Sequence, residues 1–282
     1  MSVKCHEIIS TMETLAPPKL AESWDNVGLM LGSQNSDINK ILFALDCSEA
    51  VINEAIEIGA NMIITHHPFI FKPIKTLDFE APIGKRIKKA IVNNINIYSA
   101  HTNLDIAEGG TNSTLSNLLE LNNVTGLFQT GETSFLGKIG YLKQEMTLNK
   151  LANFVKEKLN LNHLVISGNK STKIKKVGLC TGKGTDADFM QIAKNNDCQC
   201  YITGDLGYHD AQYAQDIGLC VIDGTHYFTE VIIVPVLCEY INNYFSQAKI
   251  LPEAHRLSFL RLSLIFSMLT LSLFFFSKTI FS

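Results

Sequence analysis

Six histidine and acidic side chains stand just after short apolar segments of this sequence, where they could bind metal ions or move protons. They are His66, His67, His101, Asp105, His226 and Glu230. Imidazole and carboxylate ligands together suit Zn, Fe, Mn, Co or Ni rather than Ca, and five or six of them exceed what one tetrahedral ion uses. Their number therefore predicts two divalent metal ions bridged by a carboxylate, an arrangement typical of hydrolases.

Each pair of these residues also has an ordinary structural explanation. Two adjacent histidines in a loop, as in THHPF, are more often polar surface than metal ligands. The spacing in HTNLD fits one helical turn or a tight loop, but an Asp in a loop more often caps a helix. In THYFTE, a His–Glu hydrogen bond on one helical face explains the spacing as well as a metal half-site does. The metal hypothesis therefore depends on the three segments meeting in space.

Strands and helices in alternation are expected to position these residues. Residues 41–46, 62–65 and 95–100 are apolar runs of buried-strand type, and helical patterns separate them. Ser48 can cap the first of these helices and Gly59 stands where it ends. The six candidate residues all follow such runs, and ligands bind beyond the carboxyl ends of parallel strands. We therefore expect them to converge on one cleft.

The same alternation resumes after a turn-rich middle stretch, through KKVGLC, CYIT and CVID, and ends in a long helix over residues 225–245. The pattern predicts the α/β class with mostly parallel sheets. We expect two α/β lobes, residues 1–125 and 126–250. Within the second lobe, Asp205 and His209 are expected to orient ligands or to move protons.

The composition bounds the class of protein. The chain has 282 residues, 46% hydrophobic and 18% charged, and its formal charge of −3 gives no global positive field for nucleic acid. Its seven cysteines form no C-x-x-C pair, which predicts a reducing, cytoplasmic location. A Walker lysine motif, a G-x-S-x-G elbow and a Rossmann fingerprint are all missing, which argues against nucleotide kinases, serine hydrolases and dehydrogenases.

The C-terminal tail, residues 251–282, differs from the rest. Residues 257–276 are almost wholly apolar apart from Arg261 and several serines, and only residues 262–276 are uncharged, which is short for a membrane span. A membrane anchor, an altered reading frame and a helix buried against another subunit are three competing explanations. We expect an extension without a catalytic role, with membrane contact as the alternative.

Five motifs together resemble the GTP cyclohydrolase 1 type 2 homologue family, the NIF-three-like dinuclear-metal proteins. The resemblance covers about residues 1–248 and holds in order and spacing. The motifs are SWDNVGL at 23–29, ITHHPF at 64–69, HTNLD with the following GGTN at 101–112, TGD at 203–205 and DGTHYFTE at 223–230.

The resemblance implies two α/β lobes that face each other across a metal cleft. It implies a ring-shaped homohexamer, without the inserted domain that some bacterial members carry, and a tail that departs from the family pattern. The implied metal ligands are His66, His67, Asp105, His226 and Glu230. Glu230 would bridge the two ions and His101 would lie close by. Trp24, Asp25 and Asn26 match a family motif to which no chemical step is assigned.

The resulting hypothesis is a cytoplasmic dinuclear metal-dependent hydrolase. It would open the imidazole ring of GTP at carbon C8 and release formate, with His101 as the catalytic residue that shuttles the proton. Two alternatives come from other classes of protein. One is a ring-forming metal-binding regulatory protein that holds a partner such as nucleic acid, and the other is a metal-dependent phosphoesterase.

Overall fold

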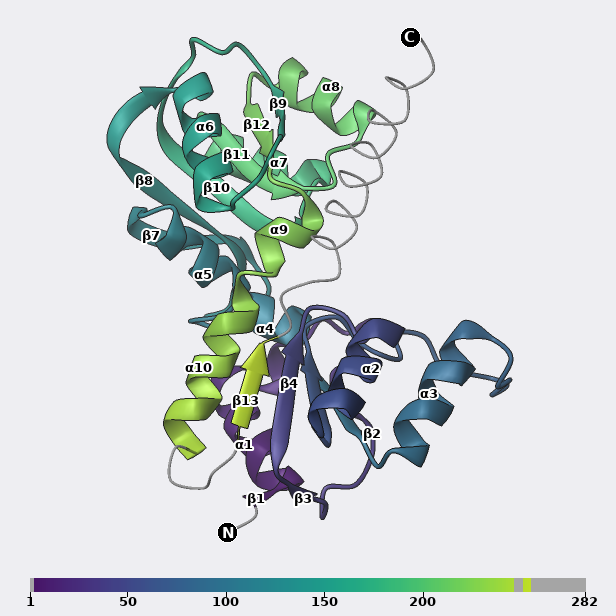
Figure 1. Cartoon of the computed structure of the whole chain (residues 1–282). Helices are drawn as coiled ribbons and strands as arrows, with labels where there is room; N and C mark the ends of the chain where they lie inside the picture. Colours follow the sequence, from purple (N-terminus) through teal and green to yellow (C-terminus); the bar gives the residue numbers. More distant parts are fainter. Residues whose placement is uncertain (1–2, 246–250, 255–282) are drawn as a thin grey trace, which may run out of the picture.

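The computed structural model describes residues 3–245 and 251–254. They form two α/β lobes, one above the other in Figure 1, which confirms the expected α/β class. No helix within these residues is long and apolar enough to cross a membrane. The apolar segment at 257–276 lies outside the described residues.

The first lobe is built on a five-stranded sheet in the order β13-β4-β5-β6-β2. Strands β13, β4, β5 and β6 are parallel, and β2 pairs antiparallel with β6. The strands are β2 (Gly28–Leu31), β4 (Lys40–Ala44), β5 (Met62–Thr65), β6 (Asn96–Ser99) and β13 (Leu251–Ala254). Strands β1 (Val3–Lys4) and β3 (Asp37–Ile38) form a separate two-stranded antiparallel sheet.

Helices cover both faces of this sheet because its central strands are apolar on both sides. Ile41 and Phe43 of β4 face one core, and Leu42 and Ala44 face the other. The first core contains α1 (Cys5–Leu15) and α10 (Ile233–Phe245), and the second contains α2 (Glu49–Ile58) and α3 (Pro82–Val92). The helices lie on opposite sides of β4 in Figure 1.

Local signals fix where helix α2 begins and ends, as the sequence predicts. The Ser48 side chain accepts a hydrogen bond from the Val51 amide at 3.2 Å. Gly59 ends the helix in the left-handed conformation, with φ of +71°. The next residues then enter β5, whose carboxyl end leads to the two adjacent histidines.

The second lobe is built on a six-stranded sheet in the order β7-β8-β10-β11-β12-β9. Its central strands β10, β11 and β12 are parallel, and the outer pairs are antiparallel. The strands are β7 (Asn122–Gln129), β8 (Phe135–Thr147), β9 (Val165–Ser167), β10 (Lys173–Lys183), β11 (Cys200–Gly204) and β12 (Cys220–Asp223).

Helices also cover both faces of the second sheet. One core contains α5 (Thr111–Leu118) and α6 (Leu148–Lys158), and the other contains α7 (Ala187–Asn195) and α8 (Tyr208–Asp216). Three short helices complete the fold between these elements. They are η1 (Pro18–Leu20), α4 (Thr102–Ile106) and α9 (His226–Glu230).

Three segments lie on the other side of the expected lobe limits at residues 125 and 250. Leu115 of α5 lies in the core of the second lobe, and Leu237 of α10 lies in the core of the first. Strand β13 pairs with β4, so residues 251–254 of the expected tail belong to the first sheet. The two helices bury apolar side chains in the core of the other lobe, which strand and helix patterns do not specify. The domain limits themselves stay a prediction.

The return of α10 to the first lobe can be tested by truncating one of its buried side chains. Leu237 is 1% exposed. We expect Leu237→Ala to lower the free energy of unfolding by about 2–5 kcal/mol because it leaves a cavity. Asn243→Ala, on the exposed side of the same helix, should change it by about 0.5 kcal/mol at most. Urea denaturation measures both values, and equal effects would contradict this packing.

Candidate metal centre

The six candidate residues meet between the two lobes, at the carboxyl ends of strands from both sheets. His66 and His67 directly follow β5, while His101 and Asp105 lie after β6, at the start and within α4. The remaining two residues occupy both ends of α9, which follows β12. The expected convergence of distant segments is therefore present in the structure.

Glu230 is the carboxylate that both halves of the cluster share. Its Oε2 lies 2.9 Å from His67 Nε2 and 3.1 Å from His226 Nε2. Its Oε1 lies 3.6 Å from His66 Nε2, which is also 3.6 Å from Asp105 Oδ1. The atoms thus form two groups of three possible ligands, each within 4.8 Å of one another, with Glu230 in both. A third such group adds His101 to the two adjacent histidines.

One ring nitrogen that faces the cluster, Nε2 of His66, has no hydrogen-bond partner within the described part of the chain. His66 Nδ1 lies 2.9 Å from the carbonyl oxygen of Ala100. Since a carbonyl only accepts, Nδ1 donates the hydrogen and Nε2 is left as an acceptor. His66 Nε2 is buried and has no hydrogen-bond partner among the described residues. Two carboxylate oxygens and this lone pair face one another, so a cation at this point would satisfy all three.

In the other three imidazoles an aspartate accepts a hydrogen bond from Nδ1, as the Ala100 carbonyl does in His66. The Nδ1 atoms of His67 and His226 donate to Asp46 at 2.7 Å and to Asp205 at 2.8 Å. His101 Nδ1 donates to a third carboxylate, Asp25, at 2.9 Å. Each bond leaves Nε2 pointing into the cluster, as in protein sites where an outer carboxylate orients a ligating histidine. The donor set therefore fits divalent metal ions that accept nitrogen and oxygen ligands.

The acids and histidines of the cluster shift one another's pKa values. Burial alone would raise the pKa of Glu230, but the neighbouring histidines outweigh it and hold that pKa well below its ordinary value. Burial alone would lower the pKa of His67, yet hydrogen bonds to Asp46 and Glu230 raise it to about 10. For His226, the hydrogen bond to Glu230 is the largest cause of a rise to about 9. Without a metal ion, His67 and His226 therefore bind protons, and a divalent cation that used the same ring nitrogens would displace them.

Threonines and a glycine hold the two carboxylates in place. Asp105 Oδ1 accepts from the hydroxyls of Thr111 and Thr181. Gly182, at the end of β10, has φ of +64°, and a Cβ added there would overlap Glu230 Oε1. The Gly182 amide donates to Thr229 at 3.0 Å, which places the end of β10 directly against α9. Only a glycine fits this close approach.

Sequence reasoning missed two of the orienting carboxylates. Asp46 is the last residue of the strand run at 41–46, so the rule that polar residues at strand ends form the site could also have found it. Asp25 lies in a loop and carries no strand signal, and only the SWDN motif singles it out. Asp205 does contact His226, as expected. His209, in contrast, is exposed, and its ring centre lies 5.2 Å from that of Tyr208.

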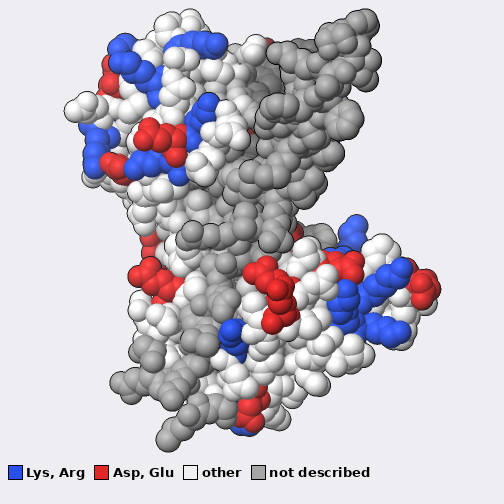
Figure 2. Space-filling view, viewed as in Figure 1, with Lys and Arg blue, Asp and Glu red and all other residues white. Residues whose placement is uncertain are grey.

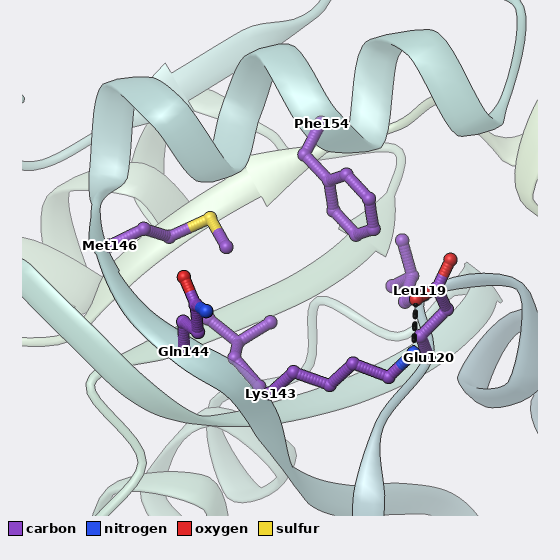
Figure 3. A pocket seen from close by; sticks show the side chains of 7 residues that line it. Leu119, Glu120, Lys143, Gln144, Met146 and Phe154 are labelled. Atoms are coloured by element: carbon purple, nitrogen blue, oxygen red, sulfur yellow. Dashed lines mark hydrogen bonds and ion pairs between the residues drawn. The ribbon is translucent and has the colours of Figure 1, made fainter.

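A separate hollow of about 220 Å³ opens on the second lobe (Figure 3). In the close-up, Lys143 reaches across it to Glu120 at 2.7 Å. None of its lining residues belongs to the cluster between the lobes. They are Leu119, Glu120, Leu142, Lys143, Gln144, Met146 and Phe154.

Comparison with known proteins places the chain in a family. The family model described as Duf34/NIF3 (NGG1p interacting factor 3) matches residues 3–256. The chain belongs to this family. The resemblance expected from the five motifs is thereby confirmed, and the match to the Duf34/NIF3 family extends into the expected tail as far as residue 256.

Relatives in the Duf34/NIF3 family match over most of the chain. A Clostridium acetobutylicum protein named "GTP cyclohydrolase 1 type 2 homolog" is 39% identical over 233 residues, with 82% of this chain and 86% of that protein covered. A Helicobacter pylori protein named "GTP cyclohydrolase 1 type 2" is 34% identical over 240 residues, with 84% and 91% covered. The crystal structure of a Bacillus cereus protein related to NIF3 has a TM-score of 0.86 at 27% identity, over 92% of this chain and 98% of that one. The expected NIF-three-like fold is therefore confirmed.

The contact between Gly182 and Glu230 predicts a sharp effect of one added methyl group. We expect Gly182→Ala to push the Glu230 carboxylate aside and to weaken divalent metal binding about tenfold or more. Gly59→Ala is the matched control, because Gly59 has a similar φ of +71° but nothing within 4 Å of the added Cβ. Gly59→Ala therefore introduces the same backbone strain as Gly182→Ala, but its methyl group overlaps no other atom. Calorimetric titration with Zn²⁺ or Mn²⁺ compares them, and equal affinities would contradict the prediction.

The orienting aspartates predict a second effect on metal binding. We expect Asp46→Asn and Asp205→Asn each to weaken metal affinity about 10- to 100-fold, because the imidazole loses the charged acceptor that fixes its orientation. Asp188→Asn, at an exposed position of α7, is the control. Metal content after dialysis against a graded chelator reports the change. If both variants retain as much metal as the wild-type protein, these aspartate–histidine contacts do not affect metal affinity.

Proposed function

We propose that this member of the Duf34/NIF3 family is a dinuclear metal-dependent hydrolase that opens the purine ring of GTP. The observation that carries the proposal is the single carboxylate, Glu230, shared by two groups of acceptor atoms. The reaction itself is suggested by the printed names of the relatives. The ions would be two of the Zn, Fe, Mn, Co or Ni class.

Each ion would have its own set of ligands from this chain. His66, Asp105 and Glu230 would hold one ion, and His67, His226 and Glu230 the other. Glu230 would then be the bridge between them. Divalent ions bound in this way act as Lewis acids that activate water and polarise the bond under attack.

His101 is the residue of the cluster best placed to move a proton. Its Nδ1 donates to Asp25, so its Nε2 carries the lone pair. Its ring centre lies 5.2 Å from that of His66 and 5.7 Å from that of His67, and its side chain is 17% exposed. Asp25 would also stabilise the imidazolium that forms when His101 accepts a proton from water, until that proton passes to the leaving nitrogen.

The surface gives no support for a nucleic-acid partner on the face shown in Figure 2. Lys and Arg side chains there form separate groups over α3 and over the second lobe, and Asp and Glu lie between them. A nucleic-acid site needs a continuous basic surface. A small nucleotide substrate therefore remains the proposed partner, and the regulatory alternative is an outcome of the test below.

The assembly and location are proposed on the family resemblance and the cysteine pattern. We infer a homohexamer and a cytoplasmic location. Light scattering of the purified full chain measures the first, and fractionation of cells measures the second. Membrane contact through the tail would place the protein in the membrane fraction instead.

The proposed reaction predicts that metal content and formate release disappear together. Wild-type protein should contain about two divalent ions per chain and release formate from GTP. We expect His66→Ala and Glu230→Gln to lose most of the metal and at least about a hundredfold in rate. Glu239→Gln, at an exposed position of α10, should behave as wild type.

Elemental analysis and a formate assay measure these outcomes, with phosphate release followed in parallel. Phosphate without formate would identify a phosphoesterase. Metal without turnover of any tested nucleotide would favour the regulatory protein. Full formate release by a metal-free His66→Ala/Glu230→Gln double variant would overturn the proposal.

A further inference from the structure

The tripeptide Trp24–Asp25–Asn26 ties two loops to the edge of the cluster. Asp25 accepts hydrogen bonds from His101 at 2.9 Å and, through its other oxygen, from the Thr102 hydroxyl at 2.6 Å. Asn26 Nδ2 donates to the carbonyl oxygen of Ile70 at 2.5 Å. The two polar residues thus hold this loop to the start of α4 on one side and to the loop after β5 on the other. They fix the position of the ring that precedes them.

Three aromatic rings meet where these loops are joined. The ring centres of Trp24 and Phe71 lie 6.1 Å apart, and each lies 6.3 Å from that of His101. The interplanar angles of 72°, 76° and 88° are those of edge-to-face contacts. Because His101 also touches the rings of His66 and His67, the aromatic group continues directly into the candidate metal centre.

The two outer rings of this group are unusually open to solvent. Trp24 is 59% exposed and Phe71 is 45% exposed. Large aromatic side chains that are fixed in one position normally bury most of their surface. Exposed aromatic side chains beside polar groups are typical of ligand-binding sites. Packing against the body of the protein therefore does not explain why the tripeptide holds Trp24 in this position.

We propose that Trp24 and Phe71 form a stacking wall that binds the planar heteroaromatic ring of the substrate beside His101. The proposal rests on the proposed function and deepens it, since it assigns the part of the substrate that lies next to the reacting atoms. An aromatic side chain binds any base through its π-face, so the wall selects a flat ring rather than one hydrogen-bonding pattern.

The geometry favours a flat ring over a quaternary ammonium group. Aromatic cages surround such a cation with several ring faces. Here the three rings meet edge to face, so they do not surround a common centre with their ring faces. A planar ring needs only one solvent-exposed aromatic side chain to stack on, and both Trp24 and Phe71 are exposed.

Trp24 is the only tryptophan of the chain, so its fluorescence reports on the wall alone. Full-length protein is titrated with guanosine, with ribose 5-phosphate and with choline. We expect guanosine to quench the fluorescence saturably, and ribose 5-phosphate and choline to leave it unchanged. Quenching by choline in place of guanosine, or no saturable response to guanosine, would overturn the stacking wall.

A pair of phenylalanine variants separates stacking from general loss of apolar surface. Phe71→Leu should weaken guanosine binding about tenfold. Phe79→Leu is the matched control, because Phe79 is 44% exposed on the same loop and packs with Lys88 instead. Trp24→Leu, followed by calorimetry, should weaken guanosine binding by a similar factor. Equal affinities of the Phe71 and Phe79 variants would contradict the proposal, and thermal melting confirms that all three variants are folded.

The stacking wall and the proposed reaction can fail separately. Saturable guanosine quenching that Phe71→Leu weakens, in a protein that releases no formate, would keep the wall and reject the reaction. Formate release with an unchanged KM in Phe71→Leu and Trp24→Leu would reject the wall and keep the reaction. A raised KM with little change in kcat in both variants is the result expected if both are correct.

Discussion

The whole site depends on imidazole nitrogens and carboxylate oxygens that are held close together around one buried carboxylate, Glu230. His66 Nε2 stands between Asp105 and Glu230, and its Nδ1 is already committed to a backbone carbonyl. Acceptor atoms at such distances repel one another unless a cation lies among them. The surrounding structure therefore has to supply the free energy that holds them together, and it does so through the packed cores on either side and the hydrogen bonds to Thr111 and Asp46.

This constraint links the two lobes. Histidines from the first sheet and a carboxylate from α9 of the second lobe point at the same place, so the cluster exists only while the lobes keep their relative position. The close approach of Gly182 to Glu230 and the bond between the Gly182 amide and Thr229 fix α9 against β10. The position of the Glu230 carboxylate thus depends on how the backbones of α9 and β10 pack, as well as on side-chain hydrogen bonds.

The sequence predicted the α/β class and the convergence of six residues because one rule applies at every strand: polar residues that follow a buried parallel strand lie at the ligand-binding edge. The roles of these residues as metal ligands stay predictions. The rule could not place Asp25, which reaches His101 from a loop. Nor could it assign α5 and α10 to a lobe, because their apolar faces would fit either sheet and only the tertiary structure decides.

The path of the chain has a consequence for its synthesis. Residues 3–106 supply most of the first lobe, but α10 and β13 complete it only after the second lobe has been made. The second lobe is thus nested within the first, and it can become compact while its host still lacks one helix and an edge strand. A newly made N-terminal fragment would leave the apolar surface of α1 and β4 open to solvent, and such surface favours aggregation until α10 and β13 are added.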